Sequence, residues 1–153
     1  MTDHPVRLVR TEDVPTAVAA ADPTVRDAGP QWRPLLDEVW AFLRDRPGLW
    51  KGGHNLMLYA ASGAGAALVE AGVQVTGTFE AAGRVRPSSL PACDAATTVH
   101  TGPITEIGAA HAAVRAWCAD QARTPTGRFW EVYDDPDPRT GQIDVEVYWE
   151  LRS

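Results

Sequence analysis

Apolar residues recur at helical spacing in two separate segments of the chain. Spacings of three or four residues place such side chains on one face of an amphipathic helix. The pattern predicts one helix over residues 27–48, ended by Pro47 and Gly48, and another over residues 103–121. The positions that carry it are Leu35, Leu36, Val39, Trp40, Phe42 and Leu43 in the first segment, and Ile107, Ala110, Val114 and Trp117 in the second.

Runs of β-branched, aromatic and other apolar residues between glycine and proline clusters predict strands around these helices. Residues 6–20 read as one short extended segment. Pro15 limits it to an edge or bent strand, because proline has no N–H for the sheet. The other predicted strands lie within residues 52–65, 66–83, 95–100, 128–135 and 142–151. The order strand, helix, strand, strand therefore occurs twice.

The two halves also match position by position inside their strands, which indicates an internal repeat. We expect an α+β fold of duplicated β-α-β-β halves, about 5–80 and 83–153, related by a pseudo-twofold axis around a central ligand cleft. The whole chain, 1–153, then forms a single domain. The matched positions are Gly29-Pro30 with Gly102-Pro103, Trp40 with Trp117, Met57 with Glu131, Tyr59 with Tyr133, and Glu70 with Glu146.

A glutamate interrupts the most aromatic strand, in the sequence GRFWEVYDDPD at residues 127–137. A carboxylate in such a strand faces water, pairs with a partner such as Arg128, or awaits a ligand. Side chains alternate along a strand, so Glu131 and Tyr133 share one face, and Trp130 and Val132 share the other. If the Trp130 face packs on the helix, Glu131 and Tyr133 point into the cleft.

Charge and composition narrow the possible partners. The chain has 153 residues and a net charge of −6, and no basic cluster is present to replace phosphate counterions, so we expect no direct nucleic acid binding. No apolar run is long enough to span a bilayer, and the N-terminal sequence lacks the order of a signal peptide. We therefore expect a cytoplasmic protein without membrane contact.

Neither the cysteines nor the histidines have the spacing of a metal site. Cys93 and Cys118 form no CxxC motif, and Cys118 is expected to be a small buried hydrophobic residue. No two histidines are four residues apart on a helix. The glycine-rich segment 63–72 lacks the lysine of a phosphate-binding loop, and the acidic turn 134–138 is expected to be solvated. We expect no metal and no cofactor.

The order and spacing of these motifs resemble the GyrI-like small-molecule-binding domains, which also form the effector-binding part of multidrug-sensing transcription regulators in bacteria. The segments that carry the resemblance are LWKGGHNLMLYAA and VEAGVQV in the first half, and HTGPITEIGAAHAAVRAWCAD, GRFWEVYDDPD and VEVYWEL in the second. It covers the chain from about residue 31. We expect a stand-alone domain, because the first predicted helix already belongs to the first half and leaves no room for the DNA-binding helical region of the regulators.

The resemblance also implies a central pocket with aromatic and acidic lining that accepts hydrophobic aromatic or cationic small molecules. Glu131 and Tyr133 match the pocket-strand motif of the family, and they would be the catalytic residues if the protein is an enzyme. Met57 occupies the position symmetric to Glu131. The remaining candidate ligand-binding residues are Trp40, Tyr59, Glu146 and Tyr148.

Three functions are consistent with this reading. The leading hypothesis is binding or sequestration of a bulky aromatic or cationic drug or toxin, with Glu131 supplying charge. The second is cofactor-independent hydrolysis of cyclopropane-bearing or other electrophilic natural products, with Glu131 as acid or base. The third is a protein-interaction module, such as a gyrase inhibitor, for which the outer surface rather than the pocket matters.

Overall fold

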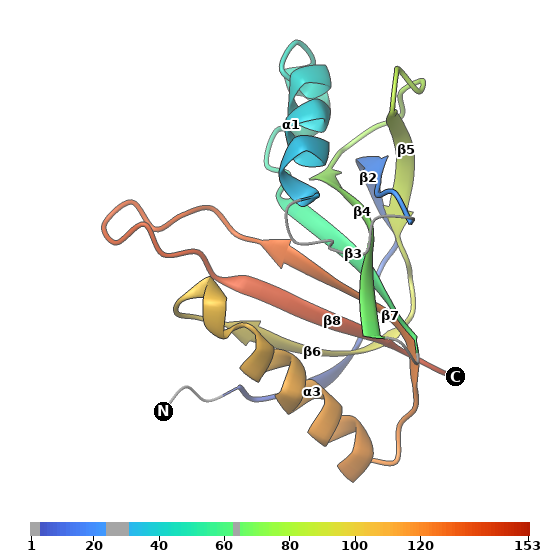
Figure 1. The fold of residues 1–153 in the computed structure, drawn as a ribbon, viewed down its shortest axis with the longest axis vertical. Helices are drawn as coiled ribbons and strands as arrows, with labels where there is room; N and C mark the ends of the chain where they lie inside the picture. The colour runs from blue at the N-terminus through green and yellow to red at the C-terminus, as the bar shows by residue number, and fades with distance from the viewer. Residues whose placement is uncertain (1–3, 24–30, 63–64) are drawn as a thin grey trace.

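A computed structural model describes residues 4–23, 31–62 and 65–153. Its strands form an eight-stranded antiparallel sheet that carries the helices, a mixed α+β fold (Figure 1). The elements are β1 (Arg7–Arg10), β2 (Val14–Ala20), α1 (Trp32–Leu43), α2 (Pro47–Trp50), β3 (Asn55–Ser62), β4 (Gly65–Gln74), β5 (Val85–Leu90), β6 (Asp94–His100), the 3-10 turn η1 (Ile104–Glu106), α3 (Gly108–Asp120), β7 (Pro125–Tyr133) and β8 (Val145–Leu151).

The strand order is β1-β6-β8-β7-β3-β4-β2-β5. The counterparts in the two halves are β1 and β5, β2 and β6, β3 and β7, and β4 and β8. Replacing each strand by its counterpart gives the same order read backwards, so a pseudo-twofold axis lies between β3 and β7. Met57 lies directly opposite Glu131 in that pair, so the two matched positions meet at the axis. Leu58 pairs with Glu70 and Val132 with Glu146, which relates those two glutamates in the same way. The duplicated arrangement predicted from the repeat is thus confirmed.

Each half contains one more strand than the pattern predicts. Residues 6–20 divide at Thr11 into β1 and β2, which leave toward opposite ends of the sheet, and β5 was not anticipated. β1 pairs with β6, and β5 pairs with β2, so each half contributes its first strand to the other. Of the two alternatives predicted for the strand that contains Pro15, the edge strand is excluded, because β2 pairs with both β4 and β5. The edge strand β5 holds Pro87 instead.

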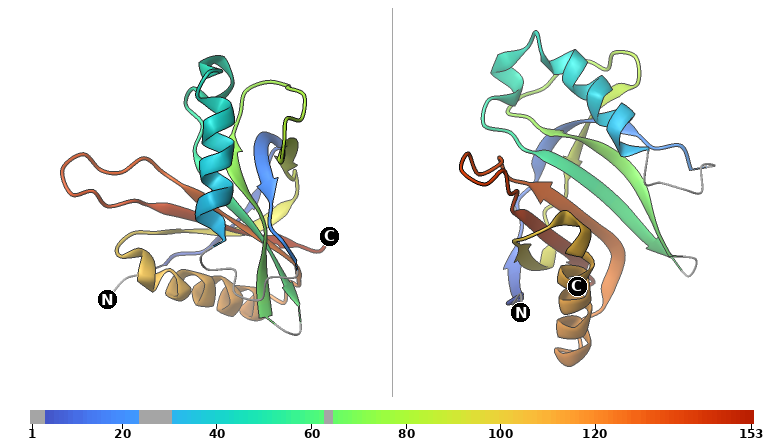
Figure 2. Two further views of the ribbon diagram at one scale, coloured as in Figure 1. Left: turned by 45° about the horizontal axis from the view of Figure 1, so that its top comes forward. Right: turned by 60° about the vertical axis from the view of Figure 1, so that its left-hand side comes forward.

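Both long helices lie over the same face of the sheet (Figure 2). Each helix buries one side chain per turn: Leu35, Val39 and Leu43 in α1, and Ala110, Val114 and Cys118 in α3. The expected burial of Cys118 is confirmed. The expected helix start at Gly29-Pro30 lies outside the described residues, whereas Gly102-Pro103 does precede η1 and α3. The equal spacing of the buried side chains makes α1 and α3 counterparts under the pseudo-twofold axis.

The opposite face of the sheet is buried without a helix. Trp130 and Val132 pack there against Val18 and Leu90 near one end of the strand order and Ala95 near the other. The sheet therefore bends until its two ends share a core. This corrects the expectation that Trp130 and Val132 face a helix: the helices cover the face that carries Phe129, Glu131 and Tyr133.

No helix in the described part of the chain has both the length and the apolar composition needed to cross a membrane.

Candidate functional site

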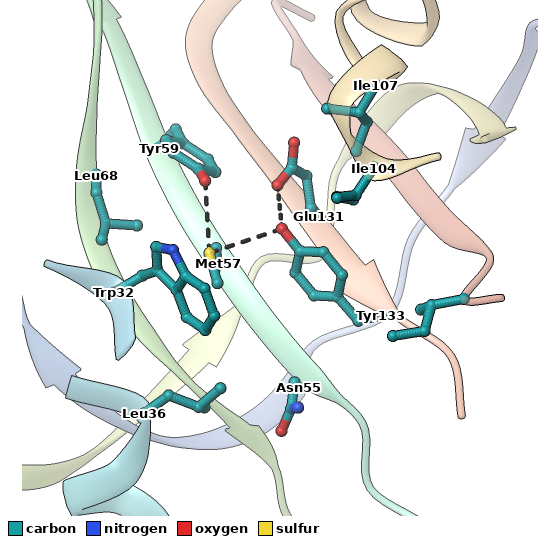
Figure 3. Close-up of a pocket in the computed structure, with 11 residues that line it drawn as sticks. Trp32, Leu36, Asn55, Met57, Tyr59, Leu68, Ile104, Ile107, Glu131 and Tyr133 are labelled. Atoms are coloured by element: carbon teal, nitrogen blue, oxygen red, sulfur yellow. Dashed lines mark hydrogen bonds between the residues drawn. The ribbon is translucent and has the colours of Figure 1, made fainter. Parts of the chain in front are cut away.

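A cavity of about 570 Å³ lies between α1 and the start of α3, above β3 and β7 (Figure 3). This volume is typical of sites for drug-sized molecules. Its lining residues come from both halves of the fold: Trp32, Leu36, Asn55, Met57, Tyr59, Leu68, Ile104, Ile107, Glu131, Tyr133 and Ile143. The cavity thus occupies the central position that the duplicated sequence predicts for a ligand.

Most of the lining is apolar, and the aromatic residues supply its specific shape. Trp32 extends from α1, and Tyr59 and Tyr133 rise from the two central strands around Met57 (Figure 3). The Tyr59 hydroxyl donates a weak hydrogen bond to the Met57 sulfur at 3.5 Å. Aromatic rings and a flexible thioether suit flat or bulky hydrophobic ligands of several shapes.

Glu131 is the one acidic residue that lines this cavity among the described residues, and only 6% of it is exposed. Its Oε2 lies 2.7 Å from His111 Nε2, and its Oε1 accepts a short hydrogen bond from the Tyr133 hydroxyl. Arg128 does not neutralise it, since its guanidinium pairs with Glu150 at 2.6 Å. The glutamate in the aromatic strand is therefore a buried, hydrogen-bonded group rather than a surface acid.

Both cavity tyrosines are held in the protonated form. Burial, followed by the nearby Glu131 carboxylate, raises the pKa of Tyr133 and the pKa of Tyr59 well above the ordinary value for phenols. A phenol that keeps its proton can donate a hydrogen bond but cannot act as a base. Tyr133 therefore orients the Glu131 carboxylate, and Tyr59 keeps the proton that it donates to the Met57 sulfur.

A row of stacked rings supports the floor of the site beneath α3. The rings of Tyr59 and Phe129 lie 5.1 Å apart, and those of Phe129 and Trp149 lie 4.8 Å apart, with interplanar angles of 9° and 14°. These residues are direct cross-strand partners on β3, β7 and β8. Such cross-strand aromatic pairs stabilise a sheet and fix the positions of neighbouring side chains.

The structure brings four of the predicted site residues together and separates three. Met57, Tyr59, Glu131 and Tyr133 line the cavity. Trp40 lies behind it, where its Nε1 donates to Asn55 Oδ1 at 2.9 Å and its ring packs against Trp50.

Glu146 and Tyr148 lie on the opposite face of the sheet. Tyr148 stacks on Trp130 and donates to Glu146 at 2.6 Å. Both residues lie on the same face as Trp130 and Val132, because Glu146 pairs directly with Val132 in the β7–β8 ladder. We therefore exclude both from the cavity site.

The sequence reading missed two important residues, Trp32 and His111. Trp32 begins α1 and reaches the cavity, although Trp40 has the more regular place in the helical pattern. His111 was not among the candidate site residues, because the histidines do not have the spacing of a metal site. Its position four residues after Ile107, on a helix with a predicted apolar face, is the signal that could have identified it.

One group of described side chains could hold a cation. His54 Nδ1 lies 3.9 Å from Asp134 Oδ1 and 3.8 Å from Asp135 Oδ1, where the start of β3 meets the end of β7. Spacing along the chain could not reveal this group, because strand pairing brings its members together. Both aspartates are exposed, and the separations also fit an ion pair with a protonated histidine.

Solved structures share this fold over nearly the whole chain. The C-terminal domain of EcmrR superposes with a TM-score of 0.77 at 16% identity, covering 98% of each chain. A hydrolase encoded by lin2189 from Listeria innocua gives a TM-score of 0.60 at 10% identity, covering 96% of this chain and 91% of the other. SAV2435 bound to tetraphenylphosphonium gives 0.53 at 16% identity, covering 99% and 95%.

At these identities the structural likeness establishes the fold alone. No curated protein matches the chain. The model of the GyrI-like small molecule binding domain matches residues 60–152, which is more than half of the chain and includes Glu131, Tyr133 and the strands and helix of the second half. By fold and by sequence, the chain belongs to the GyrI-like small-molecule-binding domain family.

Proposed function

We propose that this protein binds bulky aromatic organic cations in its central cavity. Glu131 supplies the counter-charge, while Tyr59, Tyr133 and Trp32 offer aromatic faces and Met57 an adaptable apolar contact. A cation held over an aromatic face gains about 0.5–2 kcal/mol, depending on how well it is desolvated. Apolar contact is not directional, so several compounds of similar size should bind.

The observation that carries this proposal is a buried carboxylate that neither a lysine nor an arginine of the described residues neutralises. No lysine or arginine in the described ranges forms an ion pair with Glu131, whose partners are a histidine and a tyrosine. Burying an ionised carboxylate is costly unless it is paired. An organic cation that enters the cavity would provide the missing charge, and its hydrophobic groups would cover the apolar wall.

A relative of the same fold supports the choice of ligand class. SAV2435 is described as bound to tetraphenylphosphonium, a compact lipophilic cation. Such a cation cannot donate hydrogen bonds, so a site for it relies on buried charge and aromatic contact. The cavity around Glu131 has both features, which makes tetraphenylphosphonium a suitable first probe for this chain.

The test is a thermal-shift screen of the wild type and Glu131→Gln against lipophilic cations and neutral polycyclic compounds. Losing the buried charge should weaken tetraphenylphosphonium binding about 30-fold or more, as expected for an energy of about 2 kcal/mol. Glu146→Gln is the matched control, because Glu146 forms the same kind of bond with Tyr148 on the other face. It should behave like the wild type.

The outcomes separate the candidate functions. Stabilisation by cations that disappears in Glu131→Gln, with each compound recovered intact, supports a binding protein. Equal stabilisation of both proteins would refute the role of Glu131. No shift with any compound would contradict the pocket proposal and favour the protein-interaction alternative.

Hydrolysis is the second candidate, favoured by the contact between Glu131 and His111. A carboxylate and an imidazole at 2.7 Å form an acid–base pair that could activate water against an electrophilic ring. A solved relative of the same fold is described as a hydrolase. Mass analysis of compounds recovered from the screen distinguishes the two roles. A product that has gained water only when Glu131 is present would identify an enzyme.

A further inference from the structure

Glu131 stands at the end of a chain of hydrogen bonds that runs away from the cavity. Trp149 Nε1 lies 3.0 Å from His111 Nδ1, and His111 Nε2 lies 2.7 Å from Glu131 Oε2. The three residues come from β8, α3 and β7, so the chain links two neighbouring strands to the helix above them. His111 and Glu131 are both largely buried.

Trp149 determines which nitrogen of His111 carries the proton. An indole N–H can only donate, so His111 Nδ1 must accept and cannot itself be protonated. The proton of the neutral ring is then on Nε2, which donates to Glu131. Protonating Nδ1 would set two N–H groups against each other and break the bond to Trp149. The contact therefore selects the Nε2–H tautomer of the neutral ring, whose N–H orients the Glu131 carboxylate.

The other groups that surround His111 do not determine which of its nitrogens carries the proton. Phe129 packs against the imidazole at 5.1 Å, edge to face, from β7. Tyr59 on β3 and Tyr133 on β7 retain their protons, as their raised pKa values indicate. Arg115, the next cationic residue on α3, lies over the Trp149 ring at 5.8 Å. Among these groups, Glu131 is the anion that faces His111.

The pseudo-twofold axis shows that this chain is a special feature of the second half. The equivalents of Trp149, His111 and Glu131 are Val73, Leu36 and Met57. The strand equivalents follow from the registers, since Asn55 pairs with Val73 as Phe129 pairs with Trp149. Leu36 follows buried Leu35 as His111 follows buried Ala110. All three positions hold aliphatic or thioether side chains in the first half and side chains with an N–H donor or a carboxylate in the second, as expected for residues that function together.

We propose that Trp149 and His111 are specificity-determining residues of the cavity, which hold Glu131 in place and leave its negative charge available to a cationic ligand. The inference rests on the proposed cation binding and adds its regulation. At neutral pH the site selects cations over neutral compounds of the same shape. When His111 gains a proton, the His111–Glu131 pair becomes neutral overall and that preference is lost.

The experiment measures dissociation constants for tetraphenylphosphonium and for triphenylphosphine oxide, a neutral probe of similar shape, from pH 5 to pH 8.5. The ratio of the two constants reports the charge of the site and cancels general effects of pH on folding. In the wild type, cation preference should fall about tenfold or more between pH 8.5 and pH 5, because a protonated His111 would cancel the charge of Glu131.

Two variants isolate the proposed roles. His111→Gln keeps an amide donor for Glu131 and an acceptor for Trp149 but cannot gain a proton, so its cation preference should not depend on pH in this range. Trp149→Phe keeps the stacked ring but removes the indole donor. The loss of cation preference should then occur at a higher pH than in the wild type, because Nδ1 no longer has to accept a hydrogen bond. Trp117→Phe, the same change on α3, is the control and should match the wild type.

Nitrogen-15 NMR of the His111 side chain provides an independent readout. The wild type should show a protonated Nε2 and an unprotonated Nδ1 at neutral pH, and Trp149→Phe should lose this strong preference. If wild type and Trp149→Phe share one pH profile, or if His111→Gln titrates like the wild type, the roles of Trp149 and His111 are refuted while cation binding stands. If tetraphenylphosphonium does not bind the wild type at all, the proposed function fails as well.

Discussion

The two halves of this protein share one backbone plan but build opposite walls of one cavity. Met57 and Glu131 face each other at the pseudo-twofold axis, one apolar and one charged. Around Glu131 the second half places His111, Tyr133 and Trp149, all linked by hydrogen bonds. A duplicated fold can thus acquire an asymmetric binding site by changing side chains while its strand order remains symmetric.

The same contrast extends to the opposite face and the end of the central strands. Gly72 in β4 corresponds to Tyr148 in β8, which stacks on Trp130. The ion pair of Arg128 and Glu150 in the second half has a neutral counterpart in the first, where the His54 backbone N–H donates to Gln74. The second half therefore carries more of the polar interactions in these regions.

The largest expected effect concerns the close approach of strands in the first half. A Cβ added at Gly72 would lie 2.0 Å from the Ala17 carbonyl oxygen and 2.7 Å from the Val18 side chain. Gly72→Ala should therefore force β2 and β4 apart and lower the free energy of unfolding by about 3 kcal/mol.

Urea unfolding of Gly72→Ala is to be compared with Gly48→Ala, a position with no atom within 4 Å of the added Cβ. The control should change stability by much less. Equal stability of the two variants would show that the first half tolerates a side chain here, as the second half does at Tyr148.

The next effect tests whether the polar wall, which consists of Glu131 and its hydrogen-bond partners His111 and Tyr133, acts as a unit. His111→Leu copies the first half and leaves Glu131 with one fewer donor, which should cost about 2 kcal/mol. Glu131→Met should cost a similar amount, since it leaves His111 Nε2 and the Tyr133 hydroxyl without their acceptor.

The double variant restores an apolar pair, so its cost should be smaller than the sum by at least about 1 kcal/mol. Urea unfolding of all four proteins gives this coupling energy directly. Additive effects would mean that His111 and Glu131 stabilise the fold independently, which would contradict a polar wall that acts as a unit.

The smallest effect concerns the ion pair that distinguishes the strand ends. Burial by itself raises the pKa of Glu150, but hydrogen bonds from Arg128 and Thr126 lower it overall. Because the pKa of Glu150 is lower in the folded state, the ion pair stabilises the fold at pH values above the unfolded-state pKa, which is about 4.3 for glutamate. This stabilisation is lost as the pH falls through the folded-state pKa. Arg128→Met should therefore cost about 1 kcal/mol at pH 7 and less at pH 3.

Arg139→Met, in the exposed β7–β8 loop, is the control for removal of one positive charge. It should leave the unfolding free energy almost unchanged at both pH values. A cost for Arg128→Met that does not decrease with acid would assign the effect to lost packing rather than to the ion pair.

The repeat made much of the fold predictable. Matching Met57 to Glu131 and Tyr59 to Tyr133 gave the order of the central elements and, as the register shows, the pair at the axis. The strand β5 was missed because VRPSSL is polar and contains proline, which is typical of a loop as well as of an edge strand. The strand that pairs with β5 belongs to the other half of the chain, so no local sequence pattern indicates this pairing.

The site was less predictable because its specific contacts join distant parts of the chain. Alternation along one strand was sufficient to place Glu131 and Tyr133 on a common face. The bonds from Trp149 to His111 and from His111 to Glu131 depend on how α3 lies over the sheet, which helical spacing does not specify. Trp40 and Trp32 are on one helix, and only the packing of that helix decides which of them reaches the cavity.

The most direct test makes the two walls alike. Glu131→Met places the first-half residue at the symmetric position, and the dissociation constants of tetraphenylphosphonium and triphenylphosphine oxide are then measured at pH 7.5 for this variant and the wild type. We predict that the wild type prefers the cation and that the variant loses this preference while it still binds the neutral compound. An unchanged preference for the cation in Glu131→Met would contradict the claim that the polar half determines what this protein binds.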